Sequence, residues 1–179
     1  VCAQLEKRVP IITKASVVQT GFVDGADSVM WSPPIPEILD QYTGPFHYEL
    51  FHGNSGAPVN EVIYVGPTSS DLFALDTIFY HDSINTEVIS HQYRIALYSD
   101  SVLVGMSSAA MTPWLWITPM DNAIDITVVE EIPWDNVRYQ YYRKGPLDTD
   151  YSLWKDTTTH HLVDENLNNN TSYCYKVLT

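Results

Sequence analysis

The residues that could carry acid–base catalysis stand side by side rather than facing each other. Glu130 and Glu131 are adjacent, shortly before Pro133 and Trp134. Two catalytic carboxylates must face one shared pocket, whereas neighbours on a strand point to opposite faces of the sheet. We interpret this pair as part of a solvated loop, because loops near strand ends are normally polar.

Metal-ligand residues are present but do not form a zinc-site spacing. His160 and His161 could begin a site with Asp164 or Asp156, yet zinc needs three or four converging ligands, and no Cys or third His lies at suitable spacing. The segment 148–150, Asp-Thr-Asp, resembles the start of a calcium loop without the rest of the pattern. Calcium binding between domains is therefore only an alternative. The remaining histidines are scattered and are interpreted as plain strand residues: His47, His52, His81 and His91.

Other catalytic and cofactor motifs are missing from the sequence. No Ser occupies a Gly-x-Ser-x-Gly elbow, and there is no Gly-rich phosphate loop. A Cys-His nucleophile would need an accessible, paired Cys174. This residue alternates with Tyr173 and Tyr175, so we expect it to face outward on a sheet. The sequence predicts no catalytic residue, no cofactor and no metal, and hence a chain that is not an enzyme.

The elements that must hold these residues are short β-strands. Helical periodicity is almost absent, and the best helical candidate, residues 35–41, is short and lies between prolines. Short β-rich runs separated by turn residues instead predict a sandwich or barrel. Thirteen runs are expected, seven in the first half and six in the second: 9–18, 27–31, 46–52, 61–65, 77–81, 91–98, 102–109, 114–118, 124–128, 137–143, 151–155, 159–163 and 172–178.

The two halves of the chain repeat one another. Residues 46–51 (FHYELF) match 137–142 (VRYQYY), and residues 92–97 (QYRIAL) match 172–177 (SYCYKV). The period is roughly the size of one small sandwich. We therefore predict an all-β chain of two tandem immunoglobulin-like sandwiches, of which the second lacks its last strand. The expected boundaries are a lead-in at 1–8, a first domain at 9–110 and an incomplete second domain at 111–179, with a linker near 110–113.

Composition excludes several classes of protein. The 179 residues include 9 Lys+Arg against 22 Asp+Glu, a net charge of −13. Nucleic-acid binding is excluded because it needs a basic stripe, and no apolar run reaches the length of a membrane span. Hydrophobic content of 45% is enough for a buried core. The chain lacks an initiator Met and a signal peptide, so we expect either a mature chain or a piece of a longer one.

The end of the sequence carries a family resemblance. Leu167, a polar turn, Thr171 and the run Tyr173-Cys174-Tyr175-Lys176-Val177 resemble the sixth strand of a fibronectin type III domain. Tyr173 would then be the tyrosine-corner residue, whose hydroxyl bonds back to the backbone. Trp31 resembles the core Trp of the family's second strand, and Val128 replaces it in the second copy, where Trp134 or Trp154 would fill the core. The resemblance implies four structural core residues: Trp31, Tyr93, Tyr173 and Tyr175.

A resemblance covering nearly the whole chain is to large surface proteins of Bacteroidetes. Its motifs are VCA (1–3), VPIIT (9–13), WSPP (31–34), PFHYEL (45–50), IDITV (124–128), EIPWDN (131–136), YRK (142–144) and YCY (173–175). They are similar to gliding-motility-associated proteins of the type IX secretion pathway, in which tandem fibronectin type III domains precede a type B sorting domain. This implies secretion across the outer membrane to the cell surface.

The same resemblance bears on the cysteines and on glycosylation. Cysteines occur near such domain boundaries, which implies disulfides from Cys2 and Cys174 to residues outside this chain. A Cys2–Cys174 bridge is disfavoured if the domains stack end to end, because one strand spans roughly 23 Å.

Asp followed by Ser or Thr and an apolar residue resembles the O-glycosylation motif of Bacteroidetes, although a strand beginning after a turn has the same pattern. The candidates are Ser28, Thr77, Ser83 and Ser101.

We expect a non-catalytic structural spacer and adhesion module of a large secreted cell-surface protein. Its expected partners are neighbouring domains of the same polypeptide and a cell-surface protein or polysaccharide, with no nucleic acid and no membrane insertion. The alternative is a carbohydrate-binding accessory module of a secreted glycan-degrading enzyme, since exposed aromatic rings can stack on sugars. Trp114 and Trp116 share one strand face, but we expect them to pack the second core or the domain junction. A hydrolase with its site between the domains is a third hypothesis.

Overall fold

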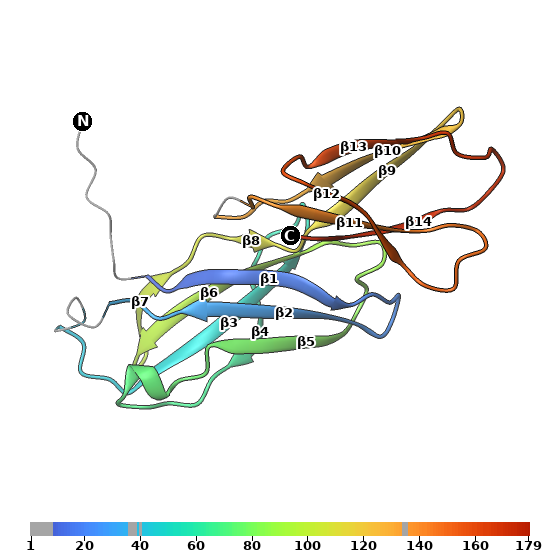
Figure 1. Cartoon of the computed structure of the whole chain (residues 1–179). Helices are drawn as coiled ribbons and strands as arrows, with labels where there is room; N and C mark the ends of the chain where they lie inside the picture. Colours follow the sequence, from blue (N-terminus) through green and yellow to red (C-terminus); the bar gives the residue numbers. More distant parts are fainter. Residues whose placement is uncertain (1–8, 36–38, 40, 134–135) are drawn as a thin grey trace. The chain divides into compact units, whose positions relative to one another are not determined.

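The computed structural model describes residues 9–35, 39, 41–133 and 136–179 (Figure 1). Within these residues the regular structure is β-strand, apart from one 3-10 turn at Leu72–Ala74. No helix in the described part is long and apolar enough to cross a membrane. The chain divides into two compact units: the first runs up to Thr112 and includes Glu131–Pro133, and the second holds Pro113–Glu130 and the chain after Pro133.

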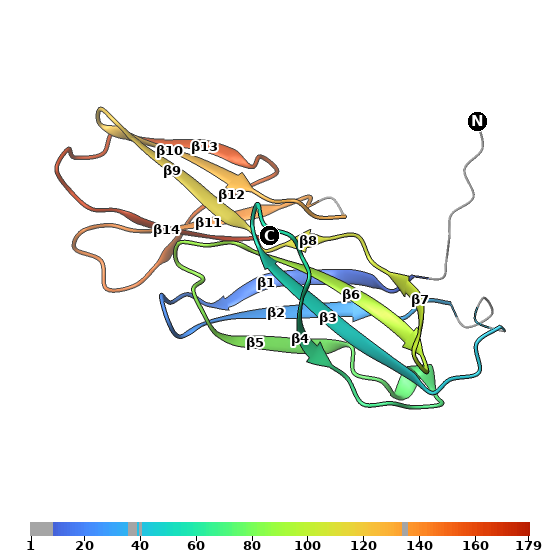
Figure 2. The ribbon, with the colours of Figure 1, turned by 180° about the vertical axis from the view of Figure 1, so that it is seen from behind.

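The first unit consists of two antiparallel sheets, seen from opposite sides in Figures 1 and 2. One sheet has the order β1-β2-β5, from strands Ile11–Gln19, Gly25–Ser32 and Ile78–Ile84. The other has the order β4-β3-β6-β7, from strands Glu61–Val65, Phe46–Asn54, His91–Ser99 and Val102–Met106. The short strand β8, Ala110–Met111, also pairs with β6.

Side-chain alternation explains why these two sheets pack face to face. On β3 the residues Phe46, Tyr48 and Leu50 are buried, two positions apart, as a strand with one covered face requires. Trp31 of β2 meets them edge-on, with 5.7 Å between its ring centroid and that of Tyr48. Aromatic pairs prefer this T-shaped arrangement because the positive edge of one ring meets the negative face of the other. Trp31 is therefore part of the core between the sheets.

The second unit repeats the arrangement with six strands. One sheet has the order β13-β10-β9, from strands His161–Glu165, Ala123–Val129 and Trp114–Met120. The other has the order β12-β11-β14, from strands Ser152–Thr157, Tyr139–Lys144 and Cys174–Leu178. Ile126, Val128, Tyr139, Tyr141 and Tyr175 form its buried core. Within the described residues β14 has no neighbour corresponding to β7, so the predicted fold class is confirmed, including the missing last strand.

Two local predictions about this fold need comment. Ala110 and Met111 are not linker residues: they form β8 and are buried, because their backbone pairs with Gln92 and Tyr93 of β6. Trp134 or Trp154 was expected to fill the second core, where Val128 replaces the Trp of the first copy. Trp154 does pack against that core. Trp134 lies outside the described residues, as does most of the helical candidate at 35–41.

Tyr141 offers a test of the second core. Its ring is fully buried, and its hydroxyl donates to the Thr159 carbonyl at 3.1 Å. Tyr141→Phe is expected to lower the free energy of unfolding of the second unit by about 1 kcal/mol, because only one hydrogen bond is lost and the packing stays. Denaturant unfolding measures the change, and a loss as large as that of a core cavity would contradict it.

Candidate functional site

Five buried or half-buried polar side chains of the first unit lie together between its two sheets. His52 of β3 and His91 and Tyr93 of β6 come from one sheet, and Asp27 of β2 and His81 of β5 come from the other. Register brings each group together, because His52 pairs with Tyr93 across β3 and β6, and Asp27 pairs with His81 across β2 and β5. We call His52, His81 and His91 the histidine cluster.

The three imidazole rings of the histidine cluster lie in mutual contact. The His52 ring centroid is 4.8 Å from that of His81 and 5.1 Å from that of His91, and the remaining pair is 6.3 Å apart. His52 Nε2 and His91 Nδ1 are 2.9 Å apart, which is a hydrogen bond. His52 and His91 are 8% and 3% exposed, so these two nitrogens are shielded from bulk water.

Each ring is also held by its other nitrogen. His52 Nδ1 lies 3.1 Å from a carboxylate oxygen of Glu61, and His91 Nε2 lies 3.0 Å from the Asn85 carbonyl oxygen. His81 Nδ1 lies 3.0 Å from the Tyr93 hydroxyl, which in turn donates to Asp27 Oδ2 at 2.7 Å. The rings therefore have fixed orientations, set by a carboxylate, a carbonyl and a tyrosine.

Burial moves the titration of this network away from ordinary values. It raises the pKa of Asp27 from 3.8 to about 7, against the opposite effect of the Tyr93 hydrogen bond. It lowers the pKa of His81 to about 4, helped by the charge on His52 and His91. The pKa of His91 is lowered as well, again mainly by burial. At neutral pH His81 and His91 are thus neutral imidazoles.

Sequence reasoning missed this site. His52, His81 and His91 are strand residues, as interpreted, but they are not scattered, because the register of four strands brings together residues far apart in sequence. One signal was present in the sequence: His52 continues the alternation of Phe46, Tyr48 and Leu50, which placed it on the buried face. His47 lies elsewhere, stacked on Tyr98.

The residues with metal or catalytic spacing in the sequence do not converge. The Glu130 carboxylate accepts from Tyr139 and Asn136, whereas Glu131 accepts from Gln92 of the first unit. His161 pairs with Asp125 at 2.9 Å. Two further aspartates have structural partners: Asp164 binds Arg143 and Tyr175, and Asp148 accepts from the Gly145 amide. Among the described residues, no group of three or more His, Cys, Asp or Glu side chains could hold a metal ion.

The four expected core residues lie as follows. Trp31, Tyr93 and Tyr175 are buried, at 3%, 0% and 8% exposure. Tyr173 is only half-buried, and its hydroxyl accepts from the Asn168 amide at 3.3 Å, which is a contact with the backbone upstream.

Cys174 is exposed and free, and its thiol hydrogen-bonds Tyr151. Its outward direction agrees with its place between Tyr173 and Tyr175 on alternate positions of the chain. Cys2 lies outside the described residues. Disulfides from either cysteine to residues beyond this chain stay a prediction.

The candidate glycosylation sites differ in access. Ser28 is buried in β2, the middle strand of its sheet, so the prediction fails there: its hydroxyl is closed to modification in the folded unit. Thr77 is half-buried, Ser83 is exposed near the end of β5, and Ser101 is exposed in a turn. Modification at those three positions stays a prediction.

Of the two expected places for Trp114 and Trp116, the second core or the domain junction, the core is excluded for Trp116. Leu115 packs on the second core, so its neighbours on the same strand must point to the other face. Trp116 is 63% exposed there, and it pairs across the strands with Thr127, which in turn pairs with His161. The outer face of this sheet therefore presents an indole on the same face as the Asp125–His161 pair, with Thr127 between Trp116 and His161.

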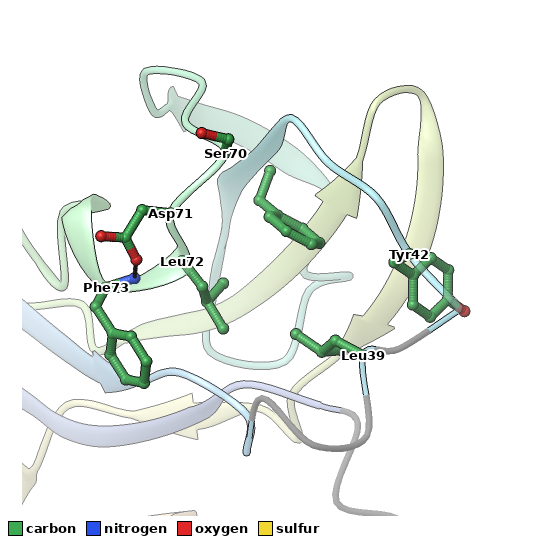
Figure 3. Close-up of a pocket in the computed structure, with 7 residues that line it drawn as sticks. Leu39, Tyr42, Ser70, Asp71, Leu72 and Phe73 are labelled. Carbon is green, nitrogen blue, oxygen red and sulfur yellow. Dashed lines mark hydrogen bonds between the residues drawn. The ribbon is translucent and has the colours of Figure 1, made fainter.

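A cavity of about 300 Å³ on the first unit lies away from all these groups (Figure 3). Its lining is about equally polar and apolar and includes Leu39, Tyr42, Leu72 and Phe73. The one carboxylate in the lining, Asp71, accepts a hydrogen bond from the Phe73 amide and so caps the 3-10 turn. This cavity does not bring together an acid and a base.

Comparison with known proteins yields structural likenesses only. No protein-family model matches the sequence, and no curated protein matches it. The chain is similar to the FN1–FN3 domains of chicken CNTN1, with 14% identity, a TM-score of 0.37, and coverage of 93% of this chain and 57% of that one. It is also similar to the central fibronectin-III array of RIM-binding protein, with 10% identity, a TM-score of 0.39, and coverage of 94% and 62%. The chain thus spans less than two thirds of either solved structure.

Proposed function

We propose that this chain is a non-catalytic spacer and adhesion module of a larger secreted cell-surface protein. The observation that carries the proposal is the tandem of two β-sandwiches of the same strand order. Such units hold neighbouring domains apart without active-site chemistry, and their function depends on grafted surface sites rather than on the fold. The net charge of −13 would limit non-specific attachment to anionic surfaces.

A domain swap in the parent protein tests the spacer role. Deleting this segment is expected to impair surface attachment by cells that carry the parent protein. Replacing it with an unrelated tandem of two sandwiches of the same length should restore attachment if the segment acts only as a spacer. If attachment returns only with the native segment, then adhesion through its own surface is the role. Normal attachment after deletion would refute both roles.

The exposed indole of Trp116 favours carbohydrate binding as a second candidate. A planar ring on a flat sheet face can stack on a sugar, and Asp125 and His161 beside it can hydrogen-bond hydroxyl groups.

Trp116→Ala tests this candidate. The variant is expected to abolish retention on xylan, cellulose or chitin in pull-down and affinity electrophoresis, because the stacking surface is removed. Tyr80→Ala is the matched control, since Tyr80 is 55% exposed on the first unit and its removal should leave retention unchanged. Equal retention of the Trp116→Ala variant and the wild-type chain would eliminate this site.

A further inference from the structure

Basic residues concentrate on one sheet of the second unit. Five of the nine Lys and Arg residues of the chain fall between positions 138 and 176. The strands β12, β11 and β14 carry four of them and only one acidic residue, Asp156. Asp156 already binds Arg138, and Arg143 binds Asp164 of the other sheet. The sheet therefore retains positive charge, although the chain as a whole has a net charge of −13.

Two lysines of this sheet share its outer face. Tyr141 of β11 and Tyr175 of β14 point into the core of the second unit. Successive residues of a strand alternate between the two faces, so Lys144 and Lys176 point outward together with Tyr142. Tyr142 pairs with Lys176 across the strands. Because Lys144 lies two residues further along β11, the two lysines are diagonal neighbours on one face.

Tyrosine rings position both ammonium groups. Lys176 Nζ lies 4.9 Å from the ring centroid of Tyr142 and 5.1 Å from that of Tyr151. Lys144 Nζ lies 5.8 Å from the centroid of the same Tyr151 ring. The face of an aromatic ring attracts a cation electrostatically but carries no net charge that could neutralise it. The two ammonium groups are thus held near one ring while their positive charge remains.

The neighbouring carboxylates do not neutralise these two groups. No carboxylate of the described residues forms an ion pair with Lys144 or Lys176. The nearest acidic residues along the chain, Asp148 and Asp150, accept hydrogen bonds from within their own loop. In a chain with 22 acidic residues, two adjacent lysines without a carboxylate partner leave their N–H donors to an anion from outside.

This face suits a polysaccharide better than a peptide. Extended peptides commonly bind by pairing with a free strand edge. The strand β11 is bonded on both sides, by β12 and by β14, so its face offers side chains and no free backbone groups. The Tyr151 ring is 39% exposed and adds a planar surface for the apolar side of a sugar ring.

We propose that the outer face of the β12-β11-β14 sheet binds an acidic polysaccharide whose sugars carry carboxylates, through Lys144, Lys176 and the rings of Tyr142 and Tyr151. Carboxylates of neighbouring sugars accept charge-assisted hydrogen bonds from the two ammonium groups. The net charge of the chain opposes binding at long range, but salt screens charges beyond about 8 Å at physiological ionic strength, so the adjacent lysines dominate. The surface is separate from that of Trp116, which lies on β9 in the other sheet of the unit.

Retention of the complete chain on bead-coupled polygalacturonate tests the proposal. The chain should be retained at low salt and released in about 1 M salt, where the screening length falls to about 3 Å. The double variant Lys144→Gln/Lys176→Gln should bind about tenfold more weakly, because both exposed charge contacts are lost. The matched control is Lys14→Gln/Arg94→Gln, which removes two exposed charges from the first unit and should bind as the wild-type chain does.

Two further measurements separate the site from general charge effects. Tyr151→Leu keeps both lysines and should weaken binding about 2–5-fold, because the ring that positions them is lost. Trp116→Ala should leave retention on polygalacturonate unchanged. Unfolding midpoints equal to that of the wild-type chain show that the variants are folded, as expected for substitutions on an outer sheet face.

Several results would overturn the proposal. Wild-type chain that is not retained at low salt is one, and retention that is unchanged in the double lysine variant is another. An equal loss in Lys14→Gln/Arg94→Gln would show that only net charge matters. Equal binding to poly-glutamate or to fully methyl-esterified polygalacturonate would show that the surface does not recognise an acidic sugar polymer. None of these results affects the spacer role, which the domain swap tests separately.

Discussion

Asp27→Asn is expected to stabilise the first unit at pH 8 by on the order of 4 kcal/mol, and to change little at pH 4. The wild-type carboxyl is buried, and its pKa is raised from 3.8 to about 7. The folded chain therefore retains a proton that the unfolded chain releases between these values, so wild-type stability falls as the pH rises from 4 to 7. Asparagine resembles the protonated form, and its amide oxygen can still accept from Tyr93.

The difference between variant and wild type isolates Asp27 from the histidines. His81 and His91 have lowered pKa values in the folded chain. Their contribution to folding stability is therefore present above pH 6.5 and is lost as the pH falls toward 4. That opposite trend occurs in both proteins and cancels. Denaturant unfolding in chelator from pH 4 to 8, with hydrogen exchange in β3 and β6 as a local readout, measures the difference.

Asp71→Asn is the control for the Asp27 experiment. Asp71 is exposed in the same unit, and asparagine replaces aspartate well as a cap, so this variant should follow the wild type at every pH. A stability gain of Asp27→Asn that did not grow with pH would contradict the assignment of a buried, protonated carboxyl.

Arg143→Met is expected to lower the free energy of unfolding of the second unit by about 3–5 kcal/mol at pH 7. Arg143 Nη1 of β11 donates to both oxygens of Asp164 of β13, at 3.1 and 2.9 Å, and so joins the two sheets. The Asp164 side chain is 4% exposed, so removal of the guanidinium leaves a buried carboxylate with only Tyr175 as a partner.

Substitution of the partner, Asp164→Asn, should lower the free energy of unfolding by less than Arg143→Met does. This difference between the two variants is the more discriminating result. In Asp164→Asn the remaining charge belongs to Arg143, whose side chain is 35% exposed and can be hydrated. Arg138→Met removes the exposed ion pair between Arg138, just before β11, and Asp156 of β12, and should change stability little. Unfolding monitored by hydrogen exchange in β11 and β14 ranks the three variants. An equal cost for Arg143→Met and Arg138→Met would contradict a buried inter-sheet ion pair.

The strands could be predicted from the sequence because their signal is local. Alternation of Phe46, Tyr48 and Leu50, or of Ile126 and Val128, marks a strand with one buried face wherever it occurs. The internal repeat, whose period is the size of one sandwich, then predicted two units, the second with six strands. Strand ends were less accurate, since β3 continues to Asn54, past the expected end at residue 52, and Ala110 forms β8 instead of a linker.

The sequence does not show which strands pack next to a given strand. The buried face of a strand therefore could not always be predicted. Trp116 and Leu115 are both apolar, and only the packing of Leu115 on the second core decides that the indole points outward. Ser28 looked like an accessible hydroxyl after a turn. It is buried because β2 lies between β1 and β5.

The sequence by itself determined an all-β chain of two sandwiches, because periodicity, turn residues and internal repeats are properties of short segments. Only the tertiary structure decided that His52, His81 and His91 meet, since they lie on three strands of two sheets and their approach depends on register and sheet packing. Tyr93 and Asp27 become partners of this cluster for the same reason. Long-range pairing, not residue type, converts isolated histidines into one site.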